Sequence, residues 1–165
     1  NWMEKHPRVG MAGPQLLNYD GSLQLSCYSF PRLFAQIVRR LSLHKRYNKL
    51  DGQVQELLMA NFDHARTAPV DWLMGSALMI RASALQQVCG FDERFFMYFE
   101  DCDLCRRFWI AGWPVYYVSD IQITHGHRRE SASVPGIKAL FKNKLTRIHV
   151  KSWLKYFYKW RGKQR

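Results

Sequence analysis

The 165-residue sequence contains no uninterrupted apolar run near the ~18 residues that a membrane-spanning helix needs. The first eight residues, 1–8, do not have the pattern of a secretory signal peptide. Only four cysteines are present, and their uneven spacing does not indicate a disulfide framework. We therefore expect reduced thiols and a cytoplasmic location.

Acidic residues are scarce, with 13 Asp and Glu against 25 Lys and Arg and a net charge of +12. The imbalance is local, because residues 128–165 hold 12 of the basic residues and only one acid, whereas residues 1–127 are nearly neutral. This division argues against a uniformly basic nucleic-acid-binding domain and predicts that one end of the chain meets an anionic surface. The 47% hydrophobic content supplies a core and excludes wholesale disorder.

Hydrophobic patterns along the chain predict an α/β fold. Strands are expected at 9–14, 70–80, 115–118 and 121–123, with a turn at 18–22. Helices are expected at 31–46, 82–88, 100–111 and 137–148, with an irregular excursion at 45–69. These few strands would leave a bare sheet edge, so we expect an incomplete mixed sheet with flanking helices. We divide the chain into residues 1–133 and a basic, aromatic helical tail at 134–165.

Three acidic residues, Glu100, Asp101 and Asp103, stand at the expected start of the 100–111 helix. One interpretation is structural: acids stabilise a helix N-terminus, and Asp103 with Arg107 forms an i,i+4 pair worth roughly 0.3–0.5 kcal/mol. The other is catalytic, since the aromatic loop 91–99 would hold two adjacent carboxylates at a helix tip. Such a base could accept a proton from a sugar hydroxyl that attacks an anomeric carbon. The residues alone leave both interpretations open.

Three segments together resemble the family 2 glycosyltransferases: Asp71–Arg81, Gly90–Arg107 with its Gly-Phe-Asp-Glu and Glu-Asp motifs, and Ala111-Gly112-Trp113. The most similar branch is the bacterial rhamnosyltransferase-like enzymes that build surface polysaccharides such as O-antigen. The stretch from His6-Pro7 to Gly13-Pro14 is similar to the segment after the donor site in that branch. The resemblance covers roughly residues 1–150.

The resemblance implies the C-terminal, acceptor-side portion of a GT-A (nucleotide-diphospho-sugar transferase) fold and sugar transfer with inversion. It implies that Asp101 is the catalytic base and that Glu100 orients it or binds acceptor hydroxyls. The sugar-binding residues that it implies are Trp72, Gly75, Ser76, Asp103 and Arg107. The donor is a nucleotide-sugar, with rhamnose suggested by the branch, and the acceptor is a saccharide or a lipid-linked saccharide. The enzyme would work at the inner face of the plasma membrane.

His125 and His127 could face the same side of an extended segment and bind a metal, although loop histidines in ordinary polar contacts give the same pattern. The resemblance implies that His125, or secondarily His127, helps an Asp-x-Asp motif to hold Mg²⁺ or Mn²⁺ against the donor diphosphate. No Asp-x-Asp precedes residue 100, and the sequence does not begin with methionine. We therefore expect a fragment that turns over little or nothing alone. The alternative is a non-catalytic truncated product, or a basic module that binds membrane or nucleic acid.

Cys102 and Cys105 are three apart on the expected helix, and we expect them to pack in the core because zinc would need a second ligand pair. The tail sets aromatic residues among basic ones: Trp153, Tyr156, Phe157, Tyr158 and Trp160 among Lys151, Lys155, Lys159 and Arg161. It could anchor the protein on an anionic membrane surface, stack nucleic-acid bases, or cover the missing half as a solvated helix. We favour the membrane and expect no nucleic-acid partner.

Overall fold

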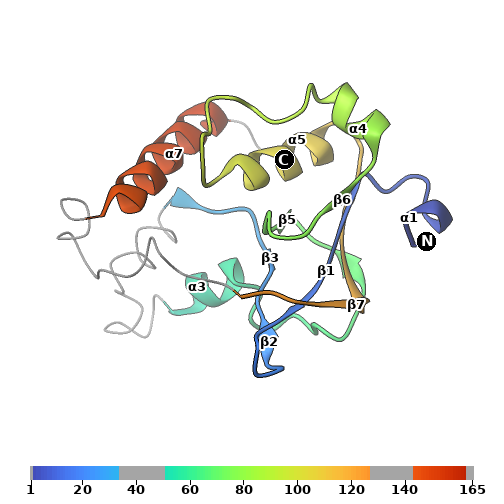
Figure 1. Ribbon diagram of the computed structural model, residues 1–165. Helices are drawn as coiled ribbons and strands as arrows, with labels where there is room; N and C mark the ends of the chain where they lie inside the picture. Colours follow the sequence, from blue (N-terminus) through green and yellow to red (C-terminus); the bar gives the residue numbers. More distant parts are fainter. Residues whose placement is uncertain (1, 34–50, 127–142, 163–165) are drawn as a thin grey trace.

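The computed structural model describes residues 2–33, 51–126 and 143–162, which form a mixed α/β structure (Figure 1). Within these ranges four strands of a five-stranded sheet have the order β2-β1-β7-β4. The fifth strand, β6, pairs with the beginning of β1, whereas β2 pairs with its end. The strands are β1 (Met11–Leu17), β2 (Leu23–Gln24), β4 (Ala68–Pro69), β6 (Met79–Ile80) and β7 (Val115–Thr124). A separate pair joins β3 (Cys27–Tyr28) to β5 (Trp72–Leu73). The expected mixed sheet with flanking helices is confirmed.

The central pair of strands, β1 and β7, runs parallel from Met11 opposite Val115 to Leu17 opposite Thr124. The register shifts after Pro14, where the proline has no N–H to give to the ladder. The prediction that β1 ends at Pro14 was wrong, because the strand continues beyond this irregularity to Leu17. The prediction of two short strands at 115–118 and 121–123 was also wrong, because both belong to β7. The expected turn at 18–22 is confirmed by the Asn18 N–H, which donates to the Ser22 carbonyl at 2.8 Å.

Five helices surround the described part of the sheet: α1 (Trp2–Lys5), α3 (Asp51–Leu57), α4 (Ala82–Gln87), α5 (Glu100–Ile110) and α7 (Lys144–Trp160). The predictions for α4 and α5 are confirmed to within one residue. Helix α3 lies in the segment expected to be irregular, and its apolar residues Val54 and Leu57 are buried. Most of the helix expected at 31–46 lies outside the described residues, as do positions 137–142 and the proposed domain boundary at 133.

Helix α5 lies between the sheet and α7, with a hydrophobic cluster on each side (Figure 1). Leu104, Cys105 and Phe108 are fully buried against β1, β5 and β7. Cys102 is equally buried in a second cluster with Phe99 and residues of α7. The expected packing of both cysteines is therefore confirmed. Each large apolar side chain buried in this way contributes about 1.5–3 kcal/mol.

Helix α7 is capped by Asn143, whose side-chain oxygen accepts hydrogen bonds from the Leu145 and Thr146 N–H groups. Its aromatic residues pack mostly inward: Tyr156 is fully buried and Trp160 is 9% exposed, whereas Tyr158 is 67% exposed. Rings that are buried in this way are not free for nucleic-acid bases to stack on, nor do they reach lipid headgroups. Helix α7 is thus part of the folded core. No helix in the described ranges is both long and apolar enough to cross a bilayer.

Candidate functional site at the start of helix α5

The chain enters α5 through two residues with unusual backbone angles. Tyr98 has φ 66° and Phe99, the N-cap residue, has φ 68°, both in the left-handed region. For a residue other than glycine, the left-handed conformation is less stable than the right-handed one by about 1–2 kcal/mol. The N-cap also lacks a side-chain hydrogen bond to the helix. Strain of this kind persists only where the surroundings impose it, and it is found preferentially at functional sites.

Aromatic rings pack around these two residues. Phe99 is 4% exposed, and its ring lies 6.4 Å from that of Trp72 and 5.2 Å from that of Tyr156. Tyr98 stacks on His149 of α7 at 4.6 Å. The strained turn is therefore held from one side by β5 and from the other by α7. As a result the first turn of α5 has a fixed direction.

Asp101 is 8% exposed and is held by backbone donors. Its Oδ2 accepts a hydrogen bond from the Gly75 N–H at 2.8 Å, and its Oδ1 accepts one from the Cys102 N–H at 2.7 Å. Burial raises the pKa of this carboxyl and outweighs the hydrogen bonds from Gly75 and Cys102 and the influence of Trp72, which lower it. No cation among the described residues forms an ion pair with Asp101. A buried carboxylate without a counter-ion has an increased affinity for a proton.

Gly75 fits against Asp101 because it has no side chain. A Cβ at this position would lie 3.3 Å from the Asp101 Oδ2, which is tighter than nearly all real Cβ contacts. Gly75 and the adjacent Ser76 are exposed in the loop between β5 and β6. The structure therefore brings together four of the predicted site residues: Trp72, Gly75, Glu100 and Asp101. Ser76 borders them on the surface.

Glu100 is half-buried at the same helix start. Its Oε2 is buried and has no hydrogen-bond partner among the described residues. Burial, and secondly the negative charge of Asp101, raise its pKa to about 7. Near neutral pH the Glu100–Asp101 pair can therefore take up or release a proton, as general acid–base catalysis requires.

Asp103 and Arg107 have structural partners instead. Asp103 is fully buried, and its Oδ2 accepts a hydrogen bond from the Arg107 Nε at 2.8 Å. Its Oδ1 lies 2.6 Å from the Lys159 Nζ and accepts a hydrogen bond from the Trp160 Nε1 at 2.9 Å. Arg107 also donates to the carbonyl of Gly90 at 2.7 Å. This geometry supports the structural interpretation for these two residues, and it leaves Asp103 no surface on which to bind a sugar.

Sequence reasoning missed the partners that α7 brings to this network. Lys159 joins Asp103 to Asp92, whose Oδ2 lies 2.6 Å from the Lys159 Nζ. Arg94 pairs with the same carboxylate at 2.6 Å, and together Arg94 and Lys159 hold the pKa of Asp92 well below its usual range. No local pattern could have indicated these contacts, because Asp103 and Trp160 are 57 positions apart.

His125, the first of the two histidines expected to bind a metal, makes its polar contacts outside the Glu100–Asp101 pair. His125 follows β7, where its Nδ1 lies 2.8 Å from the Oε1 of Gln24 and its N–H donates to the Leu17 carbonyl. His127 lies outside the described residues. Within those ranges no group of three or more His, Cys, Asp or Glu residues could hold a metal ion. The polar contact of His125 fits the alternative interpretation of an ordinary loop histidine.

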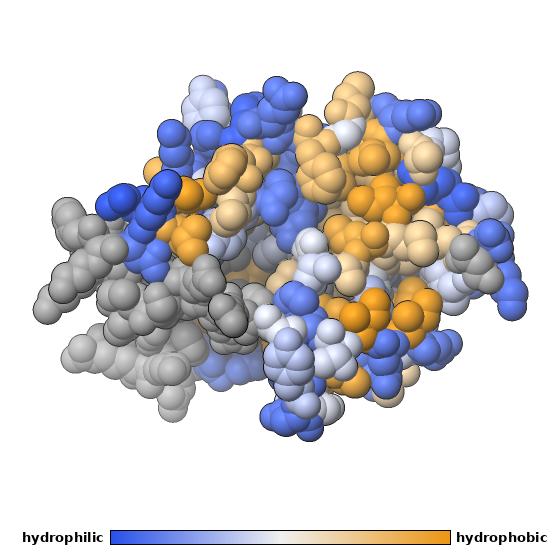
Figure 2. Space-filling view, viewed as in Figure 1, coloured by the Kyte–Doolittle hydropathy of each residue, from blue (hydrophilic) through white to orange (hydrophobic). Residues whose placement is uncertain are grey.

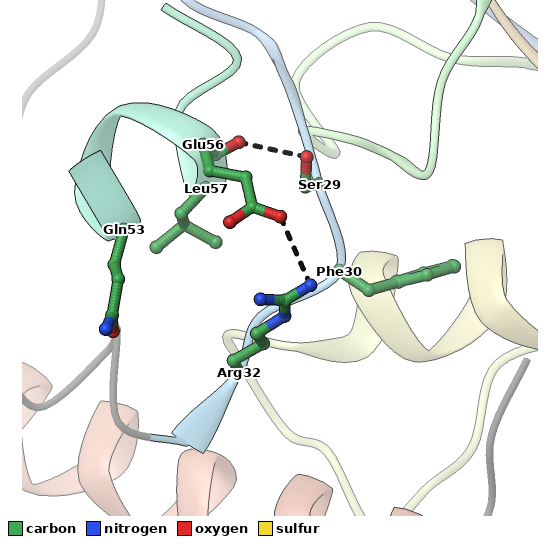
Figure 3. A pocket seen from close by; sticks show the side chains of 6 residues that line it. All are labelled: Ser29, Phe30, Arg32, Gln53, Glu56 and Leu57. Carbon is green, nitrogen blue, oxygen red and sulfur yellow. Dashed lines mark hydrogen bonds and ion pairs between the residues drawn. The ribbon is translucent and has the colours of Figure 1, made fainter.

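Two cavities in the described structure lie elsewhere. A cavity of about 20 Å³, large enough for about one water molecule, lies between α3 and the segment after β3 (Figure 3). Its lining includes the Arg32–Glu56 ion pair at 3.2 Å and the hydrogen bond from Ser29 to the Glu56 carbonyl. A larger cavity of about 410 Å³ is lined by residues 5–9, 112, 114 and 116. Neither includes Glu100 or Asp101.

Comparisons with known proteins agree on one family. The family model described as "Glycosyl transferase family group 2" matches residues 32–162. The chain is 35% identical over 144 residues to an N-acetylglucosaminyl-diphospho-decaprenol L-rhamnosyltransferase of Mycobacterium tuberculosis, which covers 86% of this chain and 45% of the relative. It is 38% identical over 87 residues to the rhamnosyltransferase WbbL of Escherichia coli K12, covering 53% of this chain and 30% of that protein. The chain thus spans less than half the length of the curated relatives it matches.

Proposed function

The chain belongs to glycosyl transferase family group 2, and on this premise we propose that the polypeptide containing it transfers a sugar, with inversion, from a nucleotide-sugar to a saccharide hydroxyl. One observation carries the proposal. Two adjacent carboxylates, Glu100 and Asp101, stand at a strained helix start, form no ion pair with a described residue, and have raised pKa values. A position of this kind suits proton exchange rather than stability.

In the proposed reaction the acceptor hydroxyl gives its proton to Asp101 while its oxygen attacks the anomeric carbon of the donor. The bond from that carbon to the diphosphate breaks, and its electron pair leaves with the nucleotide diphosphate. The Gly75 and Cys102 N–H groups hold the carboxylate in place, so little orientation is lost during the step. Burial makes Asp101 a stronger base than an exposed aspartate. Glu100 would orient the acceptor or share its proton with Asp101.

Among the described residues no group of three or more His, Cys, Asp or Glu side chains could hold a metal ion, and the Nδ1 of His125 lies 2.8 Å from the Gln24 Oε1. That His125, or secondarily His127, helps to hold Mg²⁺ or Mn²⁺ in the complete polypeptide stays a prediction.

The substrates that we propose follow the names of the relatives. Both relatives are rhamnosyltransferases, and the mycobacterial protein is named for a decaprenol-linked acceptor. We propose a nucleotide-activated deoxysugar such as rhamnose as the donor and a lipid-linked saccharide as the acceptor, with the reaction at the cytoplasmic face of the membrane. A polyprenyl carrier keeps its saccharide close to the bilayer, so the enzyme would have to work there.

Asp101→Asn in the complete polypeptide tests the mechanism. Removing a general base should lower the transfer rate about 10²–10⁴-fold while donor affinity, measured by calorimetry, stays within a few-fold. Asp63→Asn is the matched control, since Asp63 is an exposed carboxylate that also accepts a backbone N–H, from Ala65. The control should transfer sugar at the normal rate. Unchanged transfer by Asp101→Asn would show that the base is another residue.

A further inference from the structure

The outward face of α7 is basic and apolar at the same time. The described residues 144–161 contain no acid and six basic residues, of which Lys159 is paired inward with Asp92 and Asp103. Arg147, Lys151, Leu154 and Tyr158 recur at spacings of four, three and four, so they form one stripe along the helix. Leu154 is 56% exposed and Tyr158 is 67% exposed. In Figure 2 strongly hydrophilic and hydrophobic side chains adjoin each other in the region of α7.

The loop before α5 adds a large exposed ring next to this helix. Phe96 is 81% exposed and the neighbouring Met97 is 37% exposed. The loop is attached to α7 on both sides of Phe96: Ser152 donates to the Met97 carbonyl at 2.7 Å, and Lys155 donates to the Arg94 carbonyl at 2.5 Å. These two hydrogen bonds fix the loop beside α7 and leave the Phe96 ring exposed to solvent. Exposed apolar residues that gather in this way mark an interaction surface.

We propose that the stripe on α7 and the loop tip at Phe96 and Met97 together dock on an anionic lipid bilayer. Apolar side chains would enter the boundary between headgroups and acyl chains, and the basic residues would meet the lipid phosphates. Exposed Glu93 subtracts one charge, while Asp92 is already neutralised by Arg94 and Lys159. A nucleic acid fits this surface less well: bases could stack on Phe96 and Tyr158, but Leu154 and Met97 would stay unburied, whereas a bilayer buries all four side chains.

Docking in this orientation would bring the site to the membrane. Phe96 precedes Glu100 by four residues, so a bilayer in contact with Phe96 lies close to the carboxylate pair. A lipid-linked acceptor presents its saccharide at this level. This consequence, unlike the surface itself, rests on the proposed function.

Sedimentation of the complete polypeptide with vesicles tests the surface. Binding should require phosphatidylglycerol in addition to phosphatidylcholine and should weaken with added salt. Arg147→Gln with Lys151→Gln should lower the partition coefficient about 25-fold, about five-fold per cation. Phe96→Ser with Tyr158→Ser should lower it by about tenfold.

The controls carry the same changes elsewhere on the surface. Lys5→Gln with Arg8→Gln removes two exposed cations at the α1 end of the molecule, which lies away from α7 (Figure 1). Tyr19→Ser removes a ring that is 86% exposed in the β1–β2 turn. Both controls should bind vesicles as the unchanged protein does. Equal losses in variants and controls, binding that does not depend on anionic lipid, or variants that keep full binding would overturn the proposal.

An assay of sugar transfer to a short-chain, water-soluble acceptor tests the proposed function independently of vesicle binding. Arg147→Gln with Lys151→Gln should keep that activity, which also shows that the variant folds. A protein that binds vesicles through this surface but transfers no sugar would refute the function alone. One that transfers sugar but ignores these substitutions on vesicles would refute the surface alone.

Discussion

Asp101 and Asp103 lie two residues apart on α5 and are both buried, yet their surroundings are opposite. Asp103 meets the cations Arg107 and Lys159 and the indole N–H of Trp160. Asp101 meets backbone N–H groups and the side chain of Trp72, with another acid, Glu100, beside it. The neutralised carboxylate ties α7 to α5. The carboxylate for which we propose proton exchange has no counter-ion among the described residues, so the two side chains differ in their partners rather than in their depth of burial.

The largest effect on stability should follow from removing Asp103, the carboxylate that is neutralised by Arg107 and Lys159. Asp103→Ala leaves Lys159 and Arg107 without their buried partner, and we expect a loss of about 3–5 kcal/mol in the free energy of unfolding. Urea denaturation measures it. Asp63→Ala, at an exposed carboxylate, should stay within about 0.5 kcal/mol. A mild effect of Asp103→Ala would mean that the network does not hold α7 on α5.

A smaller loss of stability should follow from a substitution next to Asp101, the carboxylate held by backbone N–H groups. Gly75→Ala places a methyl group 3.3 Å from the Asp101 Oδ2, so the carboxylate must shift or the loop must move. We expect a loss of about 1–3 kcal/mol in unfolding free energy and a transfer rate lower by about tenfold. Gly52→Ala is the matched control, because a methyl group added there would meet nothing within 4 Å and α3 should gain up to about 1 kcal/mol. If both variants show the same unfolding free energy and transfer rate, the close contact of Gly75 with Asp101 contributes to neither.

The smallest effect concerns pH. The pKa of Glu100 is raised to about 7 by burial and by Asp101, so folding favours its protonated form. That stabilisation is complete below the ordinary pKa near 4.5 and disappears as the pH rises through about 7. Glu100→Gln cannot ionise, so its melting temperature relative to the unchanged protein should rise by a few degrees between pH 5 and pH 8. Glu93→Gln, at an exposed position, should show no such trend; parallel curves for Glu100→Gln would disprove the raised pKa.

The sequence predicted those parts of the site that depend on local spacing. Helix α5, with Leu104 and Phe108 inward, follows from a helical period, and the Glu-Asp motif pointed to Glu100 and Asp101. The contacts of Asp103 with Lys159 and Trp160 could not be predicted, because no periodicity links residues so far apart. The length of β1 was missed because Pro14 reads as a strand end, although the sheet accommodates it with a register shift.

The aromatic tail also differs from what its composition predicted. Composition placed Trp153, Tyr156 and Trp160 among lysines and favoured a membrane role for the rings themselves. The structure buries Tyr156 and Trp160 against Phe99 and leaves a different set of residues in solvent. Composition cannot tell which face of an amphipathic helix meets the core when both faces carry aromatic residues.

The attachment of α7 to α5 also has a consequence for synthesis. Trp160 follows Asp103 by 57 residues, which a ribosome adds in about 3–11 s. During that interval a nascent chain carries a carboxylate destined for the interior that has Arg107 as a partner but still lacks Lys159 and Trp160. A stalled or prematurely terminated product would present the unfinished helix, with its aromatic loop, to chaperones and proteases. Quality control of this protein therefore has a defined window, which closes when α7 emerges.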